Sequence, residues 1–200
     1  LDTTRGTLHA TRLVVATGGL SIPKIGATDW GHALARRFGH RVVEPRPALV
    51  PFVCGGAEWQ PFAALAGVAL PVRARALRAD APDFADDLLF THRGLSGPAA
   101  LQVSTWWRPG EPIAIDLAPG SDIGRAVVAA KSGRRHVGSV LADALPRRLA
   151  DAWVAATFGG DRPAADVRDR ALAALAAAVH RWTPSPSGTE GWNKAEVTAG

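Results

Sequence analysis

The sequence has few of the residues that define several common functional classes. It contains one cysteine, Cys54, so it can form no internal disulfide and no Cys-x-x-Cys metal or redox pair. None of its six histidines is three or four residues from another, so we expect no metal site. The glycine-rich P-loop of nucleotide hydrolases is also absent. Cys54 lies between apolar residues and two glycines, which favours a small buried side chain over a reactive thiol.

Long apolar runs are lacking as well. The longest, residues 171–179, is about half of what a bilayer span needs, and the first residues show no signal-peptide pattern. With 47% hydrophobic residues the chain is typical of folded globular proteins, and a single thiol is compatible with a reducing compartment. We therefore expect a cytoplasmic protein with no membrane partner.

Lysine is scarce in spite of a formal net charge of +5. The three lysines are scattered, and the densest basic stretch, residues 131–136, has no interleaved aromatic residues that could stack on bases. This pattern predicts no nucleic-acid partner, and we expect a small-molecule substrate instead. It says nothing about oligomeric state.

Residues 1–45 show the pattern of an α/β unit. Residues 1–19 are predicted to form two strands, the second of them buried and ending at Gly18 and Gly19. A helix follows, with Thr28 or Asp29 as its N-cap, an apolar residue at every fourth position, and Gly39 after its last turn.

Residues 46–120 change to short apolar pieces separated by Pro and Gly. Strands are expected at residues 48–53, 67–74, 88–91, 99–104 and 113–117, which predicts an antiparallel sheet or small barrel. Pro98 suits a first helical turn, so residues 99–104 are also compatible with a short helix. The acidic residues 80–87 are expected to form an exposed turn.

Residues 121–182 have helical periodicity and predict two or three packed helices. Their tryptophans, Trp153 and Trp182, fall on apolar stripes and are expected in the core. The Pro-, Ser- and Gly-rich residues 183–191 are expected to form a loop that leads to a last strand at residues 195–198.

The end of the strand at residues 13–19 is the strongest local signal. A β-branched run that stops at Ala16-Thr17-Gly18-Gly19 allows a ligand or another backbone to approach the main chain. A tight turn without any ligand fits these residues equally well.

Several longer motifs lie in one order along the chain. They are Ala16-Thr17-Gly18-Gly19-Leu20-Ser21-Ile22-Pro23-Lys24, Pro45-Arg46-Pro47-Ala48-Leu49-Val50-Pro51, Thr91-His92-Arg93-Gly94-Leu95-Ser96-Gly97-Pro98, and the terminal Ala195-Glu196-Val197-Thr198-Ala199-Gly200. Together they resemble the BaiN/YhiN-type family of FAD-dependent oxidoreductases, which includes proteins called aminoacetone oxidase family FAD-binding enzymes.

The resemblance implies a mixed α/β (α+β) fold, in which part of a Rossmann-like FAD-binding domain is interrupted by two modules. These would be a β-rich barrel or sandwich module at residues 46–120 and a small helical module at 121–182. Residues 1–45 and 183–200 would belong to the FAD-binding domain. That family begins with a Gly-x-Gly-x-x-Gly loop, which is absent here, so we expect the chain to be a middle fragment of a longer protein.

The resemblance also implies a flavoprotein that transfers a hydride between reduced FAD and an organic substrate, with NADH or NADPH as candidate electron donor. The residues expected beside FAD are Ala16, Thr17, Gly18, Gly19, Ser21, Pro23, Thr198, Ala199 and Gly200.

His92 and Ser96 are the candidate catalytic groups, because they lie in a loop that Gly94 and Gly97 would shape directly after a strand. Alternatively, both side chains only bond the backbone of their own loop. Two other functions remain open. The isolated chain could be a non-catalytic scaffold or gating module, or Ser96 could be the nucleophile of a hydrolase, although Pro98 replaces the last glycine of the Gly-x-Ser-x-Gly pattern.

Overall fold

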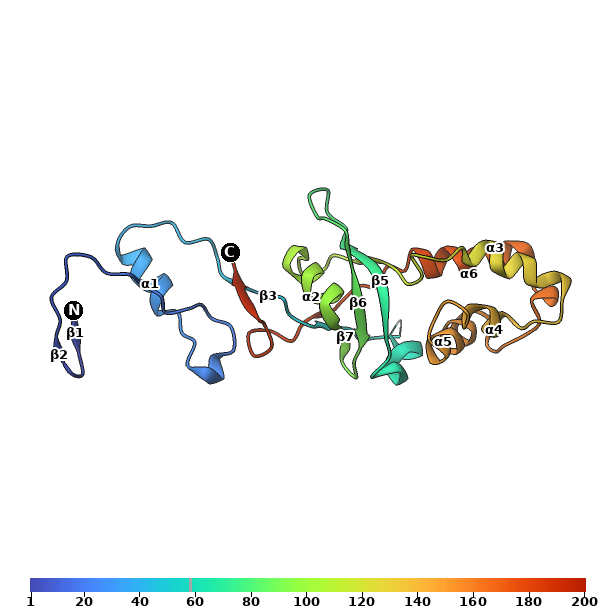
Figure 1. Ribbon diagram of the computed structural model, residues 1–200, viewed down its shortest axis with the longest axis horizontal. Coiled ribbons are helices and arrows are strands. Elements are labelled where there is room, and N and C mark those ends of the chain that lie inside the picture. Colours follow the sequence, from blue (N-terminus) through green and yellow to red (C-terminus); the bar gives the residue numbers. More distant parts are fainter. Residues whose placement is uncertain (58) are drawn as a thin grey trace.

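The computed structural model describes residues 1–57 and 59–200. In Figure 1 the chain is elongated: the N-terminal segment lies at one end, a β-sheet in the middle and a group of helices at the other end. None of the described helices is both long and apolar enough to cross a bilayer.

A six-stranded antiparallel sheet forms the middle of the molecule, in the order β8-β5-β6-β7-β4-β9. Its longest strand, β5, alternates between exposed and buried side chains, because one face of the sheet is covered. The antiparallel sheet predicted from the sequence is therefore confirmed. The strands are β4 (Phe52–Val53), β5 (Ala69–Ala76), β6 (Phe84–Phe90), β7 (Gly94–Ser96), β8 (Ile113–Asp116) and β9 (Gly188–Thr189).

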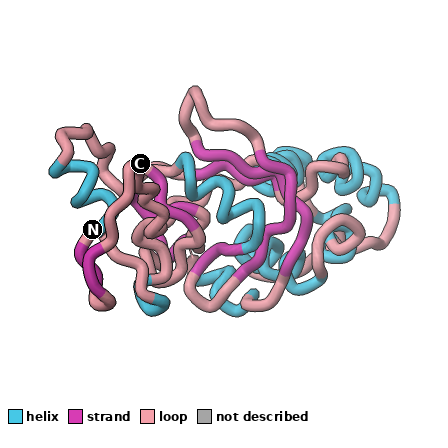
Figure 2. The backbone as a smooth tube through the Cα atoms, turned by 60° about the vertical axis from the view of Figure 1, so that its left-hand side comes forward, coloured by secondary structure: helices cyan, strands magenta, loops and turns pink. Residues whose placement is uncertain are grey.

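Helix α2 (Gly97–Trp106) takes the place of the strand expected at residues 99–104. Pro98 lies in its first turn, as the alternative interpretation required. Figure 2 shows the helix against the strands, where it packs on β5 and β6. The acidic turn is shorter than expected, because Asp86 and Asp87 belong to β6.

Four helices follow, one or two more than expected. They are α3 (Ile123–Ala129), α4 (Val137–Leu141), α5 (Arg147–Phe158) and α6 (Asp169–His180). The predicted apolar stripes are buried, including Leu149 and Trp153 of α5 and Leu172 and Val179 of α6. Gly159 follows the last residue of α5 with a left-handed φ of 73°, a conformation that favours glycine.

An aromatic cluster joins the sheet to these helices. Trp182 stacks on Phe90 of β6 with ring centroids 5.9 Å apart, and its ring meets that of Trp153 edge-on at 6.2 Å. Trp59 and Phe62 complete the cluster. The tryptophans expected in the core thus stabilise the junction of the sheet and the helices.

The N-terminal segment differs most from the sequence-based expectation. Residues 13–15 form no strand, and Val14 is 85% exposed. A buried parallel strand needs neighbours on both sides, and no described strand pairs with this stretch. The elements that form here are a short hairpin, β1 (Asp2–Thr3) with β2 (Gly6–Thr7), a 3₁₀ turn, η1 (Pro23–Ile25), and helix α1 (Trp30–Arg37).

The last strand, β10 (Val197–Ala199), forms as predicted but pairs with β3 (Arg46–Ala48) in a separate two-stranded ribbon. Thr198 lies opposite Pro47 and Ala199 opposite Arg46. This ribbon brings the C-terminal residues next to the loop around Gly19, and so positions the site described below.

Candidate functional site

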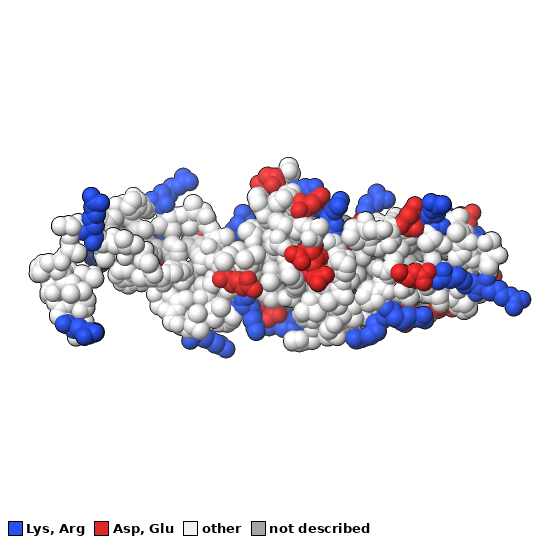
Figure 3. Space-filling view, viewed as in Figure 1, with Lys and Arg blue, Asp and Glu red and all other residues white. Residues whose placement is uncertain are grey.

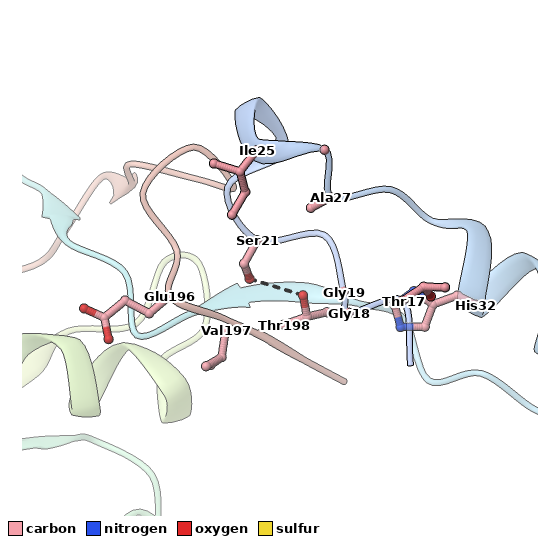
Figure 4. A pocket seen from close by; sticks show the side chains of 11 residues that line it. Thr17, Gly18, Gly19, Ser21, Ile25, Ala27, His32, Glu196, Val197 and Thr198 are labelled. Atoms are coloured by element: carbon pink, nitrogen blue, oxygen red, sulfur yellow. Dashed lines mark hydrogen bonds between the residues drawn. The ribbon is translucent and has the colours of Figure 1, made fainter. Parts of the chain in front are cut away.

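A cleft of about 650 Å³ lies between the loop of residues 17–27 and the C-terminal ribbon. Figure 4 shows the two parts facing each other, with Thr198 of β10 below Ser21. The cleft is lined by Thr17, Gly18, Gly19, Ser21, Ile25, Gly26, Ala27, His32, Glu196, Val197 and Thr198. Sequence segments almost 180 residues apart thus build one site.

The hydroxyl of Thr198 fastens the loop to the ribbon. The backbone N–H of Leu20 donates to Thr198 Oγ1 at 2.8 Å, and the hydroxyl of Ser21 lies 3.2 Å from the same oxygen. A β carbon on Gly19 would stand 2.3 Å from that oxygen. Gly19 is therefore required by close packing of the protein against itself.

Gly18 is glycine for a different reason. Its φ is +73°, and a β carbon added to it would meet nothing within 4 Å. The backbone here adopts a left-handed turn whose outer side is open to the cleft. This is the geometry expected where a ligand lies against bare peptide.

Thr17, Gly18, Gly19, Ser21 and Thr198, five of the nine residues expected beside a cofactor, line this cleft. Ala199 and Gly200 line a neighbouring cleft of about 270 Å³, which also contains Thr198. Ala16 and Pro23 line neither of the two. Pro23 starts a short 3₁₀ turn after Ile22, a β-branched residue with the unusual φ of 55°.

His32 lines both clefts, and the sequence analysis did not single it out. It lies in the first turn of α1, with Nδ1 3.0 Å from Oδ1 of Asp29, the residue that precedes the helix. The Asp-x-x-His spacing at a helix start was the available signal.

His92 and Ser96 lie in and after the turn between β6 and β7, and neither lines the cleft of Thr17 and Thr198. His92 is exposed. Thr91, rather than either of them, holds the turn together: its Oγ1 accepts from the N–H of Arg93 at 3.2 Å and from that of Gly94 at 3.0 Å.

The two glycines of this loop do shape it as expected. A β carbon on Gly94 would stand 2.3 Å from the carbonyl oxygen of Phe52, and one on Gly97 2.7 Å from that of Asp87. Both contacts are with backbone of neighbouring strands, which cannot move aside. Here too the glycines serve packing.

Cys54 lies half-buried against the core, and burial raises the pKa of its thiol to about 12. The thiol is therefore protonated and unreactive near neutrality, as expected for a structural cysteine. Among residues 1–57 and 59–200, no three His, Cys, Asp or Glu side chains come together as metal ligands.

Comparison with known proteins gives one family and close relatives. Residues 46–197 match the family model described as HI0933-like protein barrel and H2TH domain. A protein of Haemophilus influenzae named ribosomal RNA dihydrouridine synthase is 40% identical over 190 residues, which cover 94% of this chain and 47% of the relative. A protein of Escherichia coli with the same name is 38% identical over 202 residues, which cover 100% of this chain and 50% of the relative.

The chain thus spans about half the length of the curated relatives it matches. Their name contradicts the expectation of a small-molecule substrate without a nucleic-acid partner, because it places ribosomal RNA as the substrate of both relatives. That expectation relied on runs of basic and aromatic residues, whereas a folded chain gathers its RNA-binding side chains from separate segments. The family inferred from the motifs is confirmed: this chain belongs to the HI0933-like (BaiN/YhiN-type) family.

Proposed function

We propose that this chain is part of an FAD-dependent oxidoreductase that reduces uridine in ribosomal RNA to dihydrouridine. The observation that carries the proposal is the cleft between Gly18 and Thr198. The chain that forms this cleft is 40% identical to a protein named for this reaction. The motif resemblance supplies the cofactor, and the relatives' name supplies the substrate class.

The residues of the cleft fit a dinucleotide. A volume of about 650 Å³ is in the range of cofactor and ligand sites, and the open left-handed turn at Gly18 lets a flat or phosphorylated group approach the backbone. In this proposal Thr17, Gly18, Gly19, Ser21 and Thr198 would hold FAD directly, with Ala16, Pro23, Ala199 and Gly200 beside them. Reduced FAD, when bound, supplies a hydride to an electron-poor double bond such as C5–C6 of uracil.

Charge supports an RNA substrate. Residues 121–182 contain ten Lys and Arg against six Asp and Glu, whereas residues 46–120 contain six against seven. On the face seen in Figure 3, basic side chains project from the helical end and acidic ones gather over the sheet. The helical end is the part of the described chain best suited to a polyanion such as RNA.

The remaining assignments are part of the same proposal. His92 would deliver the proton that accompanies the hydride, and Ser96 would orient the base. Because neither lines the cleft, this role would require the flavin end of FAD to extend from the cleft to the β6–β7 turn, so that one uracil could receive both the hydride and the proton. NADH or NADPH would reduce the flavin.

The domain boundaries and the location belong to the same proposal. The chain would divide into domains at residues 45, 120 and 182. The parent protein would act in the cytoplasm, where ribosomal RNA is made.

A serine hydrolase is not favoured. Within the described residues Ser96 Oγ has no hydrogen bond to any histidine or carboxylate, and an activated nucleophile needs such a base. A role as a non-catalytic scaffold is favoured only for the isolated chain.

The proposal is tested with the full-length protein. We expect it to purify with a yellow flavin chromophore, and to convert uridine to dihydrouridine in ribosomal RNA when supplied with NADH or NADPH. Dihydrouridine would be quantified by mass spectrometry of digested RNA. If the purified protein were colourless, the assignment of FAD as cofactor would be refuted. If the flavin-loaded protein left uridine unchanged in every ribosomal RNA tested, the assignment of the substrate would be refuted.

A further inference from the structure

A further cavity, of about 200 Å³, shares no lining residue with the cleft and is lined by three arginines together with Asp80, Thr105 and Trp106. Arg46 comes from β3, Arg78 from the turn after β5, and Arg108 from the loop after α2. Their side chains are half-buried rather than spread into solvent. The motif that contains Arg46 was singled out in the sequence, but the proposed flavin chemistry does not use this arginine.

Only one of the three arginines is paired with carboxylates in the described structure. Arg78 Nε lies 3.4 Å from Asp80 Oδ1, and its NH1 lies 3.5 Å from Glu111 Oε1. Arg108 donates to the carbonyl oxygen of Trp107 at 3.1 Å, a neutral acceptor. For Arg46, residues 1–57 and 59–200 provide no salt bridge.

The positive charges of the three guanidinium groups therefore repel one another. Burial lowers the pKa of Arg46, and the nearby charges of Arg108 and Arg78 lower it further. An arrangement that holds like charges together without full neutralisation is costly unless an anion binds there. Guanidinium groups from different directions suit the several oxygens of a phosphate.

Two further groups in the same cavity match a nucleotide phosphate. Trp106 lines it with a half-buried ring, which offers a face for base stacking. The Oγ1 of Thr105 is buried and, in the described structure, has no hydrogen-bond partner. An orphaned hydroxyl in a cationic cavity is a spare donor for a phosphate oxygen after rotation of the side chain.

Arg46 of β3 and Thr198 of β10 belong to the same ribbon but line different hollows. Side chains directly opposite in an antiparallel pair point to the same face, and successive ones alternate. Thr198 pairs with Pro47, so Arg46, the next residue, points to the other face. Arg46 thus points away from the side of the ribbon on which Thr198 meets Ser21, and none of the three arginines lines the cleft, so an anion bound by them would be distinct from a flavin in the cleft.

We propose that Arg46, Arg78 and Arg108 bind a backbone phosphate of the RNA substrate, with Trp106 stacking on an adjacent base. This inference rests on the proposed function, because it takes RNA as the substrate. The same phosphate chemistry could come from the 2′-phosphate of NADPH, and the experiment separates the two sources.

The test compares full-length proteins in two assays: affinity for protein-free ribosomal RNA as a function of salt, and the KM values for NADPH and NADH. The double variant Arg46→Gln with Arg108→Gln removes the two arginines that lack carboxylate partners. Arg5→Gln with Arg73→Gln is the control, since it removes two exposed positive charges elsewhere. Flavin content and circular dichroism establish that each variant is folded.

We expect the double variant to bind RNA about tenfold more weakly, with the slope of log K against log salt reduced by about one, as for the loss of one phosphate contact. In the control variant, the RNA affinity and the salt slope should both change much less. If the double variant does not fold, Trp106→Ala is the substitute and should weaken RNA binding without changing the salt slope.

Three results would overturn the inference. Unchanged affinity and slope, with tight binding by the wild type, would refute the arginine site and leave the proposed function intact. A higher KM for NADPH alone would assign the site to the nicotinamide nucleotide. Failure of the wild type itself to bind or modify RNA would refute the proposed function, and the inference with it.

Discussion

The hydroxyl of Thr198 occupies the space that a side chain on Gly19 would need. A β carbon at Gly19 would stand 2.3 Å from Thr198 Oγ1 and 2.7 Å from Thr198 Cβ, both far below a normal contact. The same oxygen accepts the N–H of Leu20 at 2.8 Å. One threonine near the C-terminus thus sets the position of the loop that forms the cleft.

Replacing Gly19 by Ala should push this loop away from β10. Overpacking of this kind costs about 1–3 kcal/mol. We expect Gly19→Ala to lower the flavin content of the full-length protein, as measured by the ratio of flavin to protein absorbance. Combining it with Thr198→Ala removes the closest contact and should restore part of the loss. Additive losses in the double variant would show that the two residues do not interact.

Gly18→Val tests the ligand side of the same turn. A β carbon meets no protein atom there, so we expect the protein to fold but to lose flavin, because the side chain would enter the cleft. Gly39→Val is a matched control: its φ of +80° gives similar backbone strain, its surroundings are equally open, and it does not line the cleft. Full flavin occupancy in Gly18→Val would refute contact of FAD with this turn.

The local sequence pattern was sufficient to predict elements that have one apolar face or a clear stop signal. The alternation in β5, the apolar stripe of α5 and the stop of α1 at Gly39 could all be read from neighbouring residues. The strand expected at residues 13–19 does not form, because burial of a parallel strand depends on partners that no local pattern specifies. Residues 99–104 were ambiguous for a related reason, since a buried apolar run suits both a strand and a helix.

The candidate site was predicted as a set of residues but not as a geometry. Small residues at 16–19 suggested a close approach to the backbone, and the family resemblance of the motif at 195–200 placed it beside the same cofactor. That Thr198 fits against Gly19, 179 positions earlier, follows only from the pairing of β10 with β3. His32 was missed because an Asp-x-x-His pair at a helix start does not by itself indicate a binding site, and Thr91 because a turn-forming hydroxyl is common.

His92→Ala tests the proposed proton donor. We expect turnover of uridine to fall by about tenfold or more, in line with the loss of a general acid. Flavin content should be unchanged, because His92 is exposed and lies outside the cleft. Dihydrouridine formed per flavin is the quantity to measure. Unchanged turnover would leave His92 without a chemical role.

Thr91→Val is the control for loop structure, because it removes the hydrogen bonds that Thr91 Oγ1 makes with Arg93 and Gly94. We expect it to lower the free energy of unfolding by about 1–2 kcal/mol, as judged from urea denaturation. If His92→Ala and Thr91→Val reduced turnover and stability in the same proportion, the effect of His92 would be structural.

The buried thiol of Cys54 should make the folded protein less stable in alkaline solution. Burial raises its pKa from 9.0 to about 12 in the folded protein. Above pH 9 the unfolded chain therefore releases a proton that the folded chain retains, so the free energy of unfolding should fall as the pH rises from 9 towards 12. Below pH 9 the thiol is protonated in both states and contributes no pH dependence.

The matched variant Cys54→Ala removes this titration, although it also loses some packing. We expect its free energy of unfolding to be lower at pH 7 but to fall less steeply between pH 9 and 10.5, as measured by urea denaturation at each pH. Folded protein should also react slowly with iodoacetamide at pH 8 and rapidly in urea, because only the unfolded chain forms thiolate readily. Equal slopes for the two proteins, or fast alkylation of the folded state, would show that Cys54 is not held in an apolar environment.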